Sequence, residues 1–584
     1  MRRVFNSGSM WVSTLRRVTS NGFKGNLHEI GWKAGVQHGE MTKCSVCRRF
    51  NNSFNIRRAR SLSRQCVQTF VIRKTFRRLP LSAEPCESSA WPRPYSQQLP
   101  EMDCGTAMNV AGLEGYTNKN EGKTILTVAM KYDAIIIGSG QAGNPLSQAL
   151  AKLGKTVALI DYSYLGGTCI NTGCTPTKAM IGSAQVAYYA RNAARWGVNA
   201  GYVKVDMQEV MRRKDAIVEH SRSALETGVQ TQPNIHWYKG RAHFLGPKQV
   251  EVDSTKLEAD QIFIDTGSQA TVPKVNGMDS VNHLSNEGLL SLREVPDHLV
   301  IIGAGYVGLE FAQMFRRFGS EVTVISDGGQ ILPREDRDIA DELQRALIAE
   351  GVRFVMDARI HKIKNTPRQM EFLFEGKPDD TINATHLLVA TGRKPNTSDL
   401  DLDKAGVQTD EHGFIQVNRR LETTAPGIWA LGDVTGGPMF THISYNDFQI
   451  VFGNLYEGKD LATDERIVPY AVYTDPELGR VGMTETEARK KGYKLKVGSV
   501  KMTSVARAIE RGETHGMMKL VVDASNDRIL GAAILSSEGG EAVQVLSTLM
   551  LAQKPYTLLK GAIYIHPTIV EGFYGLMESV KPLE

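Results

Sequence analysis

The alternation of apolar and polar positions repeats itself within the chain. Residues 132–161 predict an apolar strand, a glycine-rich turn, an amphipathic helix and a second apolar strand. Residues 297–326 align with them without gaps and predict the same four elements in the same order. Because strand–helix–strand units build doubly wound parallel sheets, the pattern predicts two Rossmann-like α/β domains.

Each repeat carries a G-x-G-x-x-G motif between its first strand and its helix. The first glycine makes a tight turn, the second lets the backbone approach a pyrophosphate, and the third allows close helix packing. The phosphate then lies at a helix N-terminus. Two such motifs, placed alike in an internal repeat, predict two dinucleotide sites. The glycines are Gly138, Gly140 and Gly143 in the first repeat and Gly303, Gly305 and Gly308 in the second.

The end of the second strand in each repeat indicates which nucleotide binds there. Asp161 stands 23 residues after the first glycine of its turn, where a carboxylate accepts from ribose hydroxyls, as in FAD binding. The equivalent residue of the second repeat is Ser326, followed by Asp327. Arg334 or Arg337 could reach the 2′-phosphate of NADPH, whereas Asp327 could serve NADH. The choice stays open, with a slight preference for NADPH.

Two cysteines, Cys169 and Cys174, follow the first repeat. Residues five apart in a regular helix have Cα atoms roughly 8 to 9 Å apart, too far for a disulfide, so an irregular backbone is expected between them. Gly173 allows that, and Thr175-Pro176 suits an N-cap and first helical position. A helix N-terminus and Lys178 both lower a thiol pKa. The spacing predicts a redox pair, with one thiolate against a flavin and the other exchanging with substrate.

The first 130 residues have a different character, without sustained periodicity. Residues 1–80 contain 17 Lys and Arg but 2 Asp and Glu, whereas the whole chain has a net charge of +6, so the remainder is mildly acidic. We expect a disordered basic extension, either an organellar transit peptide or upstream sequence without function. Cys44-Ser-Val-Cys47 is half a zinc motif without a second pair, so no metal site is expected.

The rest of the composition excludes several classes of protein. A mildly acidic body argues against nucleic acid as a partner. No apolar run reaches the roughly 20 residues of a membrane span, so no membrane association is expected. Two cysteines after residue 130 do not make a disulfide-stapled secreted scaffold. We expect a cytoplasmic protein, or a mitochondrial or plastid one if the extension is a transit peptide.

Four further motifs follow one another along the chain: Gly166-Gly-Thr-Cys-x4-Cys174, Ala390-Thr-Gly-Arg393, Ala430-Leu-Gly-Asp433 and His566-Pro-Thr-x-x-Glu571. Together with the two glycine turns, they resemble the class I pyridine nucleotide-disulfide oxidoreductases. This family includes dihydrolipoamide dehydrogenase, glutathione reductase and mercuric reductase, and the resemblance covers about residues 131–584. Two further segments, which begin at Thr441 and Ser504, resemble the mercuric-reductase-like branch that includes reactive-chlorine-resistance flavoproteins with copper reductase activity.

The resemblance implies a role for each candidate catalytic residue. Cys174 would be the charge-transfer thiol facing the flavin, and Cys169 the interchange thiol that attacks substrate. Lys178 would approach the flavin N5 and pair with Glu310. His566, oriented by Glu571, would be the acid/base, supplied by the partner subunit of a homodimer. The implied cofactor-binding residues are Gly138, Gly140, Gly143, Asp161, Gly167, Thr168, Lys178, Thr266, Gly267, Gly303, Gly305, Gly308, Ser326, Gly392, Arg393, Gly432 and Asp433.

We therefore expect an α/β protein with FAD and NAD(P) domains of Rossmann type and an α+β C-terminal dimerisation domain. The expected parts are a disordered extension (1–130), the FAD domain in two parts (131–285 and 394–465), the NAD(P) domain (286–393) and the dimerisation domain (466–584).

The expected function is that of an FAD-dependent NAD(P)H oxidoreductase with a redox-active Cys169–Cys174 disulfide. Either the dithiol or the flavin would reduce the acceptor, which is a disulfide, a metal ion such as Cu(II) or Hg(II), or a quinone. In the family, mercuric reductase passes the metal to a cysteine pair near its C-terminus. The last 12 residues of this sequence contain no cysteine, which argues against mercuric reduction. Retention of His566 keeps dihydrolipoamide dehydrogenase as an alternative. A flavin-binding regulator is the alternative from another class, and the cysteines with Lys178, His566 and Glu571 disfavour it.

Overall fold

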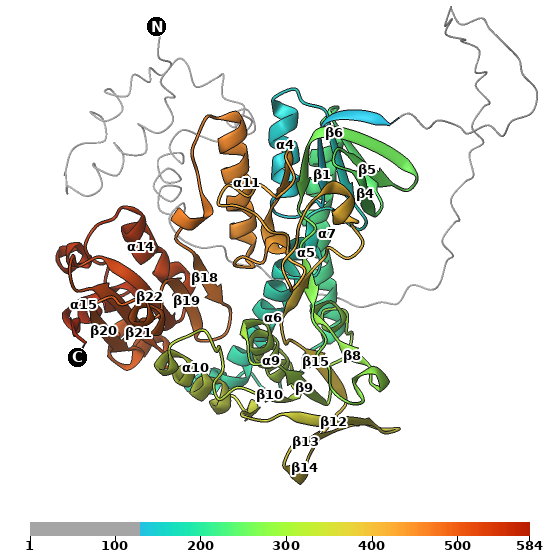
Figure 1. Ribbon diagram of the computed structural model, residues 1–584. Helices are drawn as coiled ribbons and strands as arrows, with labels where there is room; N and C mark the ends of the chain where they lie inside the picture. Colours follow the sequence, from blue (N-terminus) through green and yellow to red (C-terminus); the bar gives the residue numbers. More distant parts are fainter. Residues whose placement is uncertain (1–128, 584) are drawn as a thin grey trace, which may run out of the picture. The chain divides into compact units, whose positions relative to one another are not determined.

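The structure is a computed structural model that describes residues 129–583, apart from the side chains of residues 377–379 (Figure 1). The expectations for the basic extension and its targeting concern residues outside this range.

The first sheet has the strand order β3-β2-β1-β6-β5-β4. β17 pairs in parallel with the last three residues of β6, beyond the part of β6 that pairs with β5. Its centre is parallel, because β1 pairs in parallel with both β2 and β6. The hairpin β4-β5 continues the sheet in antiparallel register. The strands are β1 (Met130–Ile137), β2 (Val157–Asp161), β3 (Ile235–Lys239), β4 (Ala242–Gly246), β5 (Gln249–Val252), β6 (Thr255–Ile264) and β17 (Ile428–Ala430).

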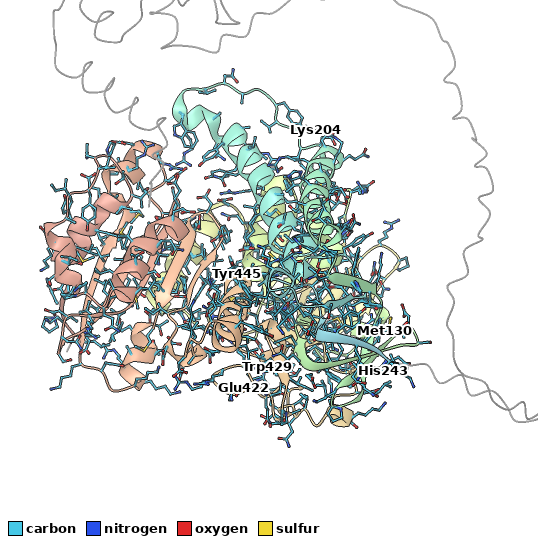
Figure 2. All side chains as sticks on the ribbon, turned by 90° about the horizontal axis from the view of Figure 1, so that it is seen from above. Met130, Lys204, His243, Glu422, Trp429 and Tyr445 are labelled. Carbon is cyan, nitrogen blue, oxygen red and sulfur yellow. The ribbon has the colours of Figure 1, made fainter. Side chains whose placement is uncertain are left out.

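Both faces of β1 are covered, which explains its unbroken apolar run. Ile136 packs in a cluster with residues of α4 (Gly143–Lys152) and α11 (Thr441–Tyr456). Ile135 faces the other way, into a cluster with β4, β5 and the segment around residues 400–434. Trp429 of β17, labelled in Figure 2, stacks on Phe263 of β6 with 5.1 Å between ring centroids. A strand buried on both sides needs apolar residues throughout.

The second sheet repeats this design with the order β11-β10-β9-β15-β8, and all its pairings are parallel. Helices α9 (Tyr306–Phe318) and α10 (Arg337–Ala349) supply apolar residues to the cluster that buries it. The strands are β8 (His283–Leu284), β9 (His298–Ile302), β10 (Glu321–Ile325), β11 (Arg353–Val355) and β15 (His386–Val389), beside an antiparallel sheet of β12 (Ile360–Asn365), β13 (Met370–Phe374) and β14 (Lys377–Ala384).

The glycine turns explain why the two repeats share a backbone. Gly138 and Gly303 have φ angles of +104° and +112°, a left-handed conformation that favours glycine. A Cβ on Gly143 would lie 2.1 Å from the carbonyl oxygen of Gly138, and Gly308 stands in the same relation to Gly303 at 2.2 Å. Each third glycine therefore lets its helix pack closely on the turn, as the motif predicts.

The domain boundaries stay predictions, and the second sheet suggests a refinement of one of them. β8 precedes residue 286 but pairs in parallel with β15. We propose that the boundary expected at 285/286 falls before His283. A short ladder of β7 (Ser268–Ala270) and β16 (Arg393–Pro395) joins the two places where the chain passes between the sheets.

The third sheet is antiparallel at every pairing and has the strand order β18-β19-β22-β21-β20-β23. Met518 faces a cluster with α14 (Gly539–Leu551) and α15 (Phe573–Glu578), whereas Met517 faces the cluster of α9 and α10. Its strands are β18 (Pro469–Val472), β19 (Glu477–Gly482), β20 (Leu495–Lys501), β21 (Met517–Asp523), β22 (Ile529–Ser536) and β23 (Lys581–Pro582). The mixed α/β class with parallel sheets and an α+β C-terminal part is confirmed.

Candidate active site

The two cysteines lie on separate helices joined by a break in the backbone. Cys169 is in the short helix α5 (Gly167–Asn171), and Cys174 is the first residue of α6 (Cys174–Asn192). Thr172 and Gly173 between them are not helical, as the five-residue spacing predicts. The expected N-cap at Thr175 is wrong, because Gly173 is the N-cap. Pro176 lies in the first turn instead, where a missing backbone N–H costs no helical hydrogen bond.

The sulfur of Cys174 lies where two helices begin. It is at the start of α6, and its Sγ is 3.2 Å from the hydroxyl oxygen of Thr441, the first residue of α11. The hydrogen bond with the Cys169 thiol is the largest cause that lowers the pKa of Cys174 to about 6, and Thr441 and Lys178 act in the same direction. Cys174 is therefore the member of the pair that carries negative charge at neutral pH.

Cys169 has the opposite protonation preference. Its hydrogen bond with Cys174 and its burial raise the pKa of the Cys169 thiol. Both cysteines are free in this structure, so it represents the dithiol form of the pair. One thiolate and one thiol are the products expected when a disulfide takes up two electrons and one proton.

Lys178 forms the ion pair expected with Glu310. Its Nζ lies 2.7 Å from Glu310 Oε2, and the glutamate side chain is 4% exposed. The other carboxylate oxygen of Glu310 accepts from the backbone N–H of Tyr473 at 3.0 Å. The ammonium also lies 4.6 Å from the centre of the Tyr473 ring. Glu310 and Tyr473 thus fix the Lys178 ammonium one helical turn from Cys174.

His566 and Glu571 also form the expected pair. The two carboxylate oxygens of Glu571 lie 2.9 and 3.0 Å from His566 Nδ1. A carboxylate in this position orients the imidazole and fixes Nε2 as the nitrogen free to exchange protons. The His566 side chain is 68% exposed, so one chain by itself leaves the imidazole open at the surface.

The first glycine turn fits a bound dinucleotide. A Cβ on Gly167 would lie 3.0 Å from Gly140 Cα, so the glycines keep side chains out of the space before α4. Asp161 accepts hydrogen bonds from Ser139, at 3.0 Å from its N–H and 2.6 Å from its hydroxyl. A second carboxylate, that of Asp265, lies at the first N–H groups of α4. No sequence argument had singled out Asp265.

Asp433 lies in a cluster formed by three separate segments. Its carboxylate accepts from Ser268 Oγ at 2.6 Å, and Arg393 Nε is 3.8 Å away. Arg393 also donates to Ser268 Oγ at 2.7 Å. Gly432 donates its N–H to Asp447 at 2.8 Å, and Thr266 donates its hydroxyl to the chain at residue 396. The structure therefore brings the predicted residues Thr266, Arg393 and Asp433 to one region.

The second glycine turn leaves the choice of nicotinamide cofactor open. Ser326 follows β10, and its hydroxyl accepts from the N–H of Gly328 at 3.2 Å. Arg337, the first residue of α10, pairs with Asp341 on the same helix at 2.9 Å and donates to the carbonyl of Gly329 at 3.2 Å. Arg334 is exposed. These contacts select neither NADPH nor NADH.

Sequence reasoning missed Thr441, Tyr473 and Asp265 as site residues. Thr441 marked a branch of the family, but its contact with Cys174 joins residues 267 positions apart. Tyr473 contributes a backbone N–H, which carries no sequence signal. A usable signal existed for Asp265, since a carboxylate at the end of a buried parallel strand is unusual.

Two negative findings concern residues 129–583. No cluster of three or more His, Cys, Asp or Glu side chains that could hold a metal ion occurs in this range. None of the helices described there is both long enough and apolar enough to cross a membrane.

With this geometry in place, comparison with known proteins defines the class. The pyridine nucleotide-disulphide oxidoreductase family matches residues 132–447, and its dimerisation domain matches residues 468–576. The chain belongs to this family of FAD- and NAD(P)H-dependent oxidoreductases, and the dimerisation domain supports a homodimer.

Individual relatives agree with this assignment. The probable pyridine nucleotide-disulfide oxidoreductase RclA of Escherichia coli is 38% identical over 459 residues, which cover 77% of this chain and all of RclA. Dihydrolipoyl dehydrogenase of Thermus scotoductus is 35% identical over 455 residues, covering 77% of this chain and 97% of that protein. A solved Cu(II) complex of E. coli RclA, called an HOCl-induced flavoprotein disulfide reductase, matches with a TM-score of 0.71, 38% identity, and coverage of 77% and 100%.

Proposed function

We propose that the chain uses NAD(P)H to reduce its Cys169–Cys174 disulfide and that the resulting dithiol reduces a disulfide or Cu(II). The observation that carries this proposal is the unequal pair of sulfurs. Cys174 is the stabilised thiolate at two helix starts, and Cys169 is the protonated thiol beside it. In pairs of this kind one sulfur exchanges with the substrate disulfide, and the other then closes the internal disulfide.

The residues fit FAD as the group that links the nucleotide to the sulfurs. When bound, FAD accepts a hydride equivalent from NAD(P)H and delivers two electrons to a neighbouring disulfide. In this proposal the first glycine turn holds the diphosphate, Asp161 the ribose and Asp433 the ribityl chain. The Lys178–Glu310 pair, 2.7 Å apart, stabilises charge that changes next to it.

Reduction of a substrate disulfide then takes two exchange steps. The Cys169 sulfur, once deprotonated, attacks one substrate sulfur and releases the other as a thiol. The Cys174 thiolate attacks Cys169, closes the internal disulfide and releases the second thiol. Two electrons pass from the dithiol to the substrate, and each released thiolate takes up one proton. With Cu(II) as acceptor, the thiol–thiolate pair gives one electron to each of two Cu(II) ions, giving two Cu(I) ions. Cys169 releases its proton to water or to a base as the two sulfurs close to the disulfide.

The protons come from the partner subunit's His566 in this proposal. The imidazole is exposed in one chain and is oriented by Glu571, so it is available to a site completed by a second copy. General acid–base catalysis requires this contact only where a thiol is deprotonated or a thiolate leaves.

Two acceptors receive support from particular observations. Cu(II) is favoured by the likeness to RclA, for which a Cu(II) complex has been solved. A dithiol or disulfide such as lipoamide is favoured by the His566–Glu571 pair, because electron transfer to Cu(II) needs no proton delivered to a leaving thiolate. Dihydrolipoamide dehydrogenase is therefore the second candidate. Hg(II) and quinones are less supported acceptors.

The deciding experiment is a turnover assay with the full-length protein and three variants. NADPH and NADH oxidation is followed with lipoamide, glutathione disulfide, Cu(II), Hg(II) and a quinone. We expect Cys169→Ser and Cys174→Ser each to lower disulfide and Cu(II) turnover by at least about 10³-fold, because the reaction loses its exchanging sulfur. Val186→Ala, on the exposed side of the same helix α6, is the matched control and should retain activity.

Quinone reduction that survives in both cysteine variants would identify electron transfer that bypasses the sulfurs. Full retention of disulfide and Cu(II) turnover in the Cys169→Ser variant would contradict the proposal.

A further inference from the structure

Asp265 occupies the place where the fold presents hydrogen-bond donors to a diphosphate. It follows β6, and its backbone N–H donates to Ile137 at the end of β1. Its Oδ2 accepts from the N–H of Gly143 at 2.7 Å and from that of Ala142 at 3.3 Å. These are the first N–H groups of α4, the helix start at which this turn binds the diphosphate of a dinucleotide.

The carboxyl group is enclosed on all sides by the flavin-binding segments. Asp265 is 7% exposed. A Cβ on Gly140 would lie 2.7 Å from Oδ2, and a Cβ on Gly432 would lie 2.9 Å from Oδ1. The carboxyl therefore lies between the glycine turn and the segment that carries Asp433, and only glycines on both sides make room for it.

The surroundings of Asp265 oppose a negative charge. The charged groups that face it are Asp433, beside α11, and Asp447, on α11. Each of these has its own cation, Arg393 at 3.8 Å and Arg466 at 2.5 Å. Within residues 129–583, no basic side chain forms an ion pair with Asp265. Burial, with help from the two carboxylates, raises the pKa of Asp265 well above its usual range, although the two N–H groups act against this.

The internal repeat shows what the same position requires for dinucleotide binding alone. Gly138 packs on the backbone oxygen of Asp265, and Gly303 packs in the same way on that of Ala390. Asp265-Thr-Gly and Ala390-Thr-Gly are therefore equivalent positions in the two units. The second unit has a methyl group where the first has a carboxyl group, so the fold of the turn does not need the carboxylate.

We propose that Asp265 makes FAD binding proton-dependent, because its ionised carboxylate competes with the FAD diphosphate for the N–H groups that begin α4. The protonated carboxyl carries no charge, so it accepts from those N–H groups more weakly and does not repel the diphosphate. FAD then binds together with one proton at Asp265. By linkage, the affinity for FAD is full below the pKa of Asp265 in the free protein and falls as the pH rises above it, by roughly tenfold per pH unit.

The test measures FAD release from the purified full-length holoenzyme. The protein is diluted to nanomolar concentration between pH 6 and 9, and free FAD is quantified by its fluorescence. The variants are Asp265→Asn, which keeps the shape, and Asp265→Ala, which copies Ala390. Asp260→Asn is the matched control, because Asp260 lies on the same strand with an exposed carboxylate. Circular dichroism verifies folding of each variant.

We expect the wild type and Asp260→Asn to release FAD progressively as the pH rises. Both Asp265 variants should hold FAD with a dissociation constant that varies less than about threefold over the range, and at pH 6 they should match the wild type. Either neutral variant suffices if the other does not fold. A pH profile shared by wild type and neutral variants would overturn the proposal, as would a flat wild-type profile. Weaker FAD binding by the neutral variants at every pH would also overturn it.

The inference requires FAD, the cofactor of the family, and no particular acceptor. Fluorescence of released FAD does not depend on turnover, so a negative result here and a failed disulfide assay are distinguishable.

Discussion

The two dinucleotide-binding units present the same turn with different side chains around it. In the first unit, the chain leaves β2 and forms the short helix α5, which carries Cys169, and then the long helix α6, which begins at Cys174. In the second unit, the chain leaves β10 through a loop at Ser326 that holds itself together with local hydrogen bonds. A carboxyl group approaches the helix start in the first unit only, since Ala390 takes the place of Asp265. The two units thus share the backbone of the turn and differ in the segments that follow their second strands.

The charged groups of the molecule's two units are also distributed unequally. The first unit combines a thiolate, the Lys178–Glu310 ion pair and several buried carboxyl groups within one site. The second unit places Glu310 in this site from its own helix α9, so it helps the chemistry of the first while keeping a simple nucleotide turn. The comparison predicts large effects on turnover from changes around the sulfurs and small effects from changes around the second turn.

Outside the cysteine pair, the largest effect is expected for His566→Ala. Disulfide exchange moves a proton at each sulfur, and general acid–base catalysis contributes typically 10²–10⁴-fold, so lipoamide turnover should fall by that factor. Cu(II) and quinone reduction should largely survive, because no thiol leaves in those reactions. Side-by-side kcat/KM values for the three acceptors check this. Equal loss of all three activities would show that His566 acts through the dimer interface.

A smaller effect should follow when the second unit is given the carboxylate of the first. Ala390→Asp places a negative charge at the start of α9, where the second glycine turn is expected to bind the diphosphate of the nicotinamide dinucleotide. We expect KM for NAD(P)H to rise roughly tenfold at pH 8, one charge–charge interaction of about 1.4 kcal/mol, with FAD content unchanged. Ala390→Asn is the neutral control. An unchanged KM in the Ala390→Asp variant would contradict the claim that Ala390 and Asp265 occupy equivalent positions in the two turns.

The smallest effect concerns the hydroxyl that contacts Cys174. A lowered pKa means that the Cys174 thiolate is present above about pH 6 and is lost as the pH falls through that value. Thr441→Val removes a hydrogen-bond donor worth about 1 kcal/mol, so the midpoint should rise by about one pH unit. Thr441→Ser should restore it. The thiolate absorbance of the reduced protein near 240 nm, titrated from pH 4 to 9, reports the midpoint, and identical midpoints in all three proteins would exclude the contact.

Much of this site could be predicted because its parts are local or belong to motifs. The glycine turns, the broken backbone between the cysteines and the His566–Glu571 pair each depend on residues within a few positions of one another. The Lys178–Glu310 pair joins distant residues and was expected only from the resemblance to the family.

The remainder depends on tertiary packing. Thr441 reaches Cys174 because α11 begins beside α6, and nothing near either residue in the sequence signals that approach. Asp265 becomes a candidate site residue only because its carboxyl group, after the end of β6, accepts from the N–H of Gly143 at the start of α4. The helix α6 begins two residues earlier than its capping residues suggest, because Gly173 serves as the N-cap and Pro176 is tolerated in the first turn.

The most direct test of the account is the spectrum of the two-electron-reduced protein. A Cys174 thiolate against the flavin should give a long-wavelength charge-transfer band in the wild type. Cys169→Ser should keep that band, and Cys174→Ser should abolish it, because only Cys174 combines a lowered thiol pKa with the helix starts of α6 and α11. A wild-type protein without the band, or a Cys174→Ser variant that retains it, would contradict the assignment of Cys174 as the stabilised thiolate.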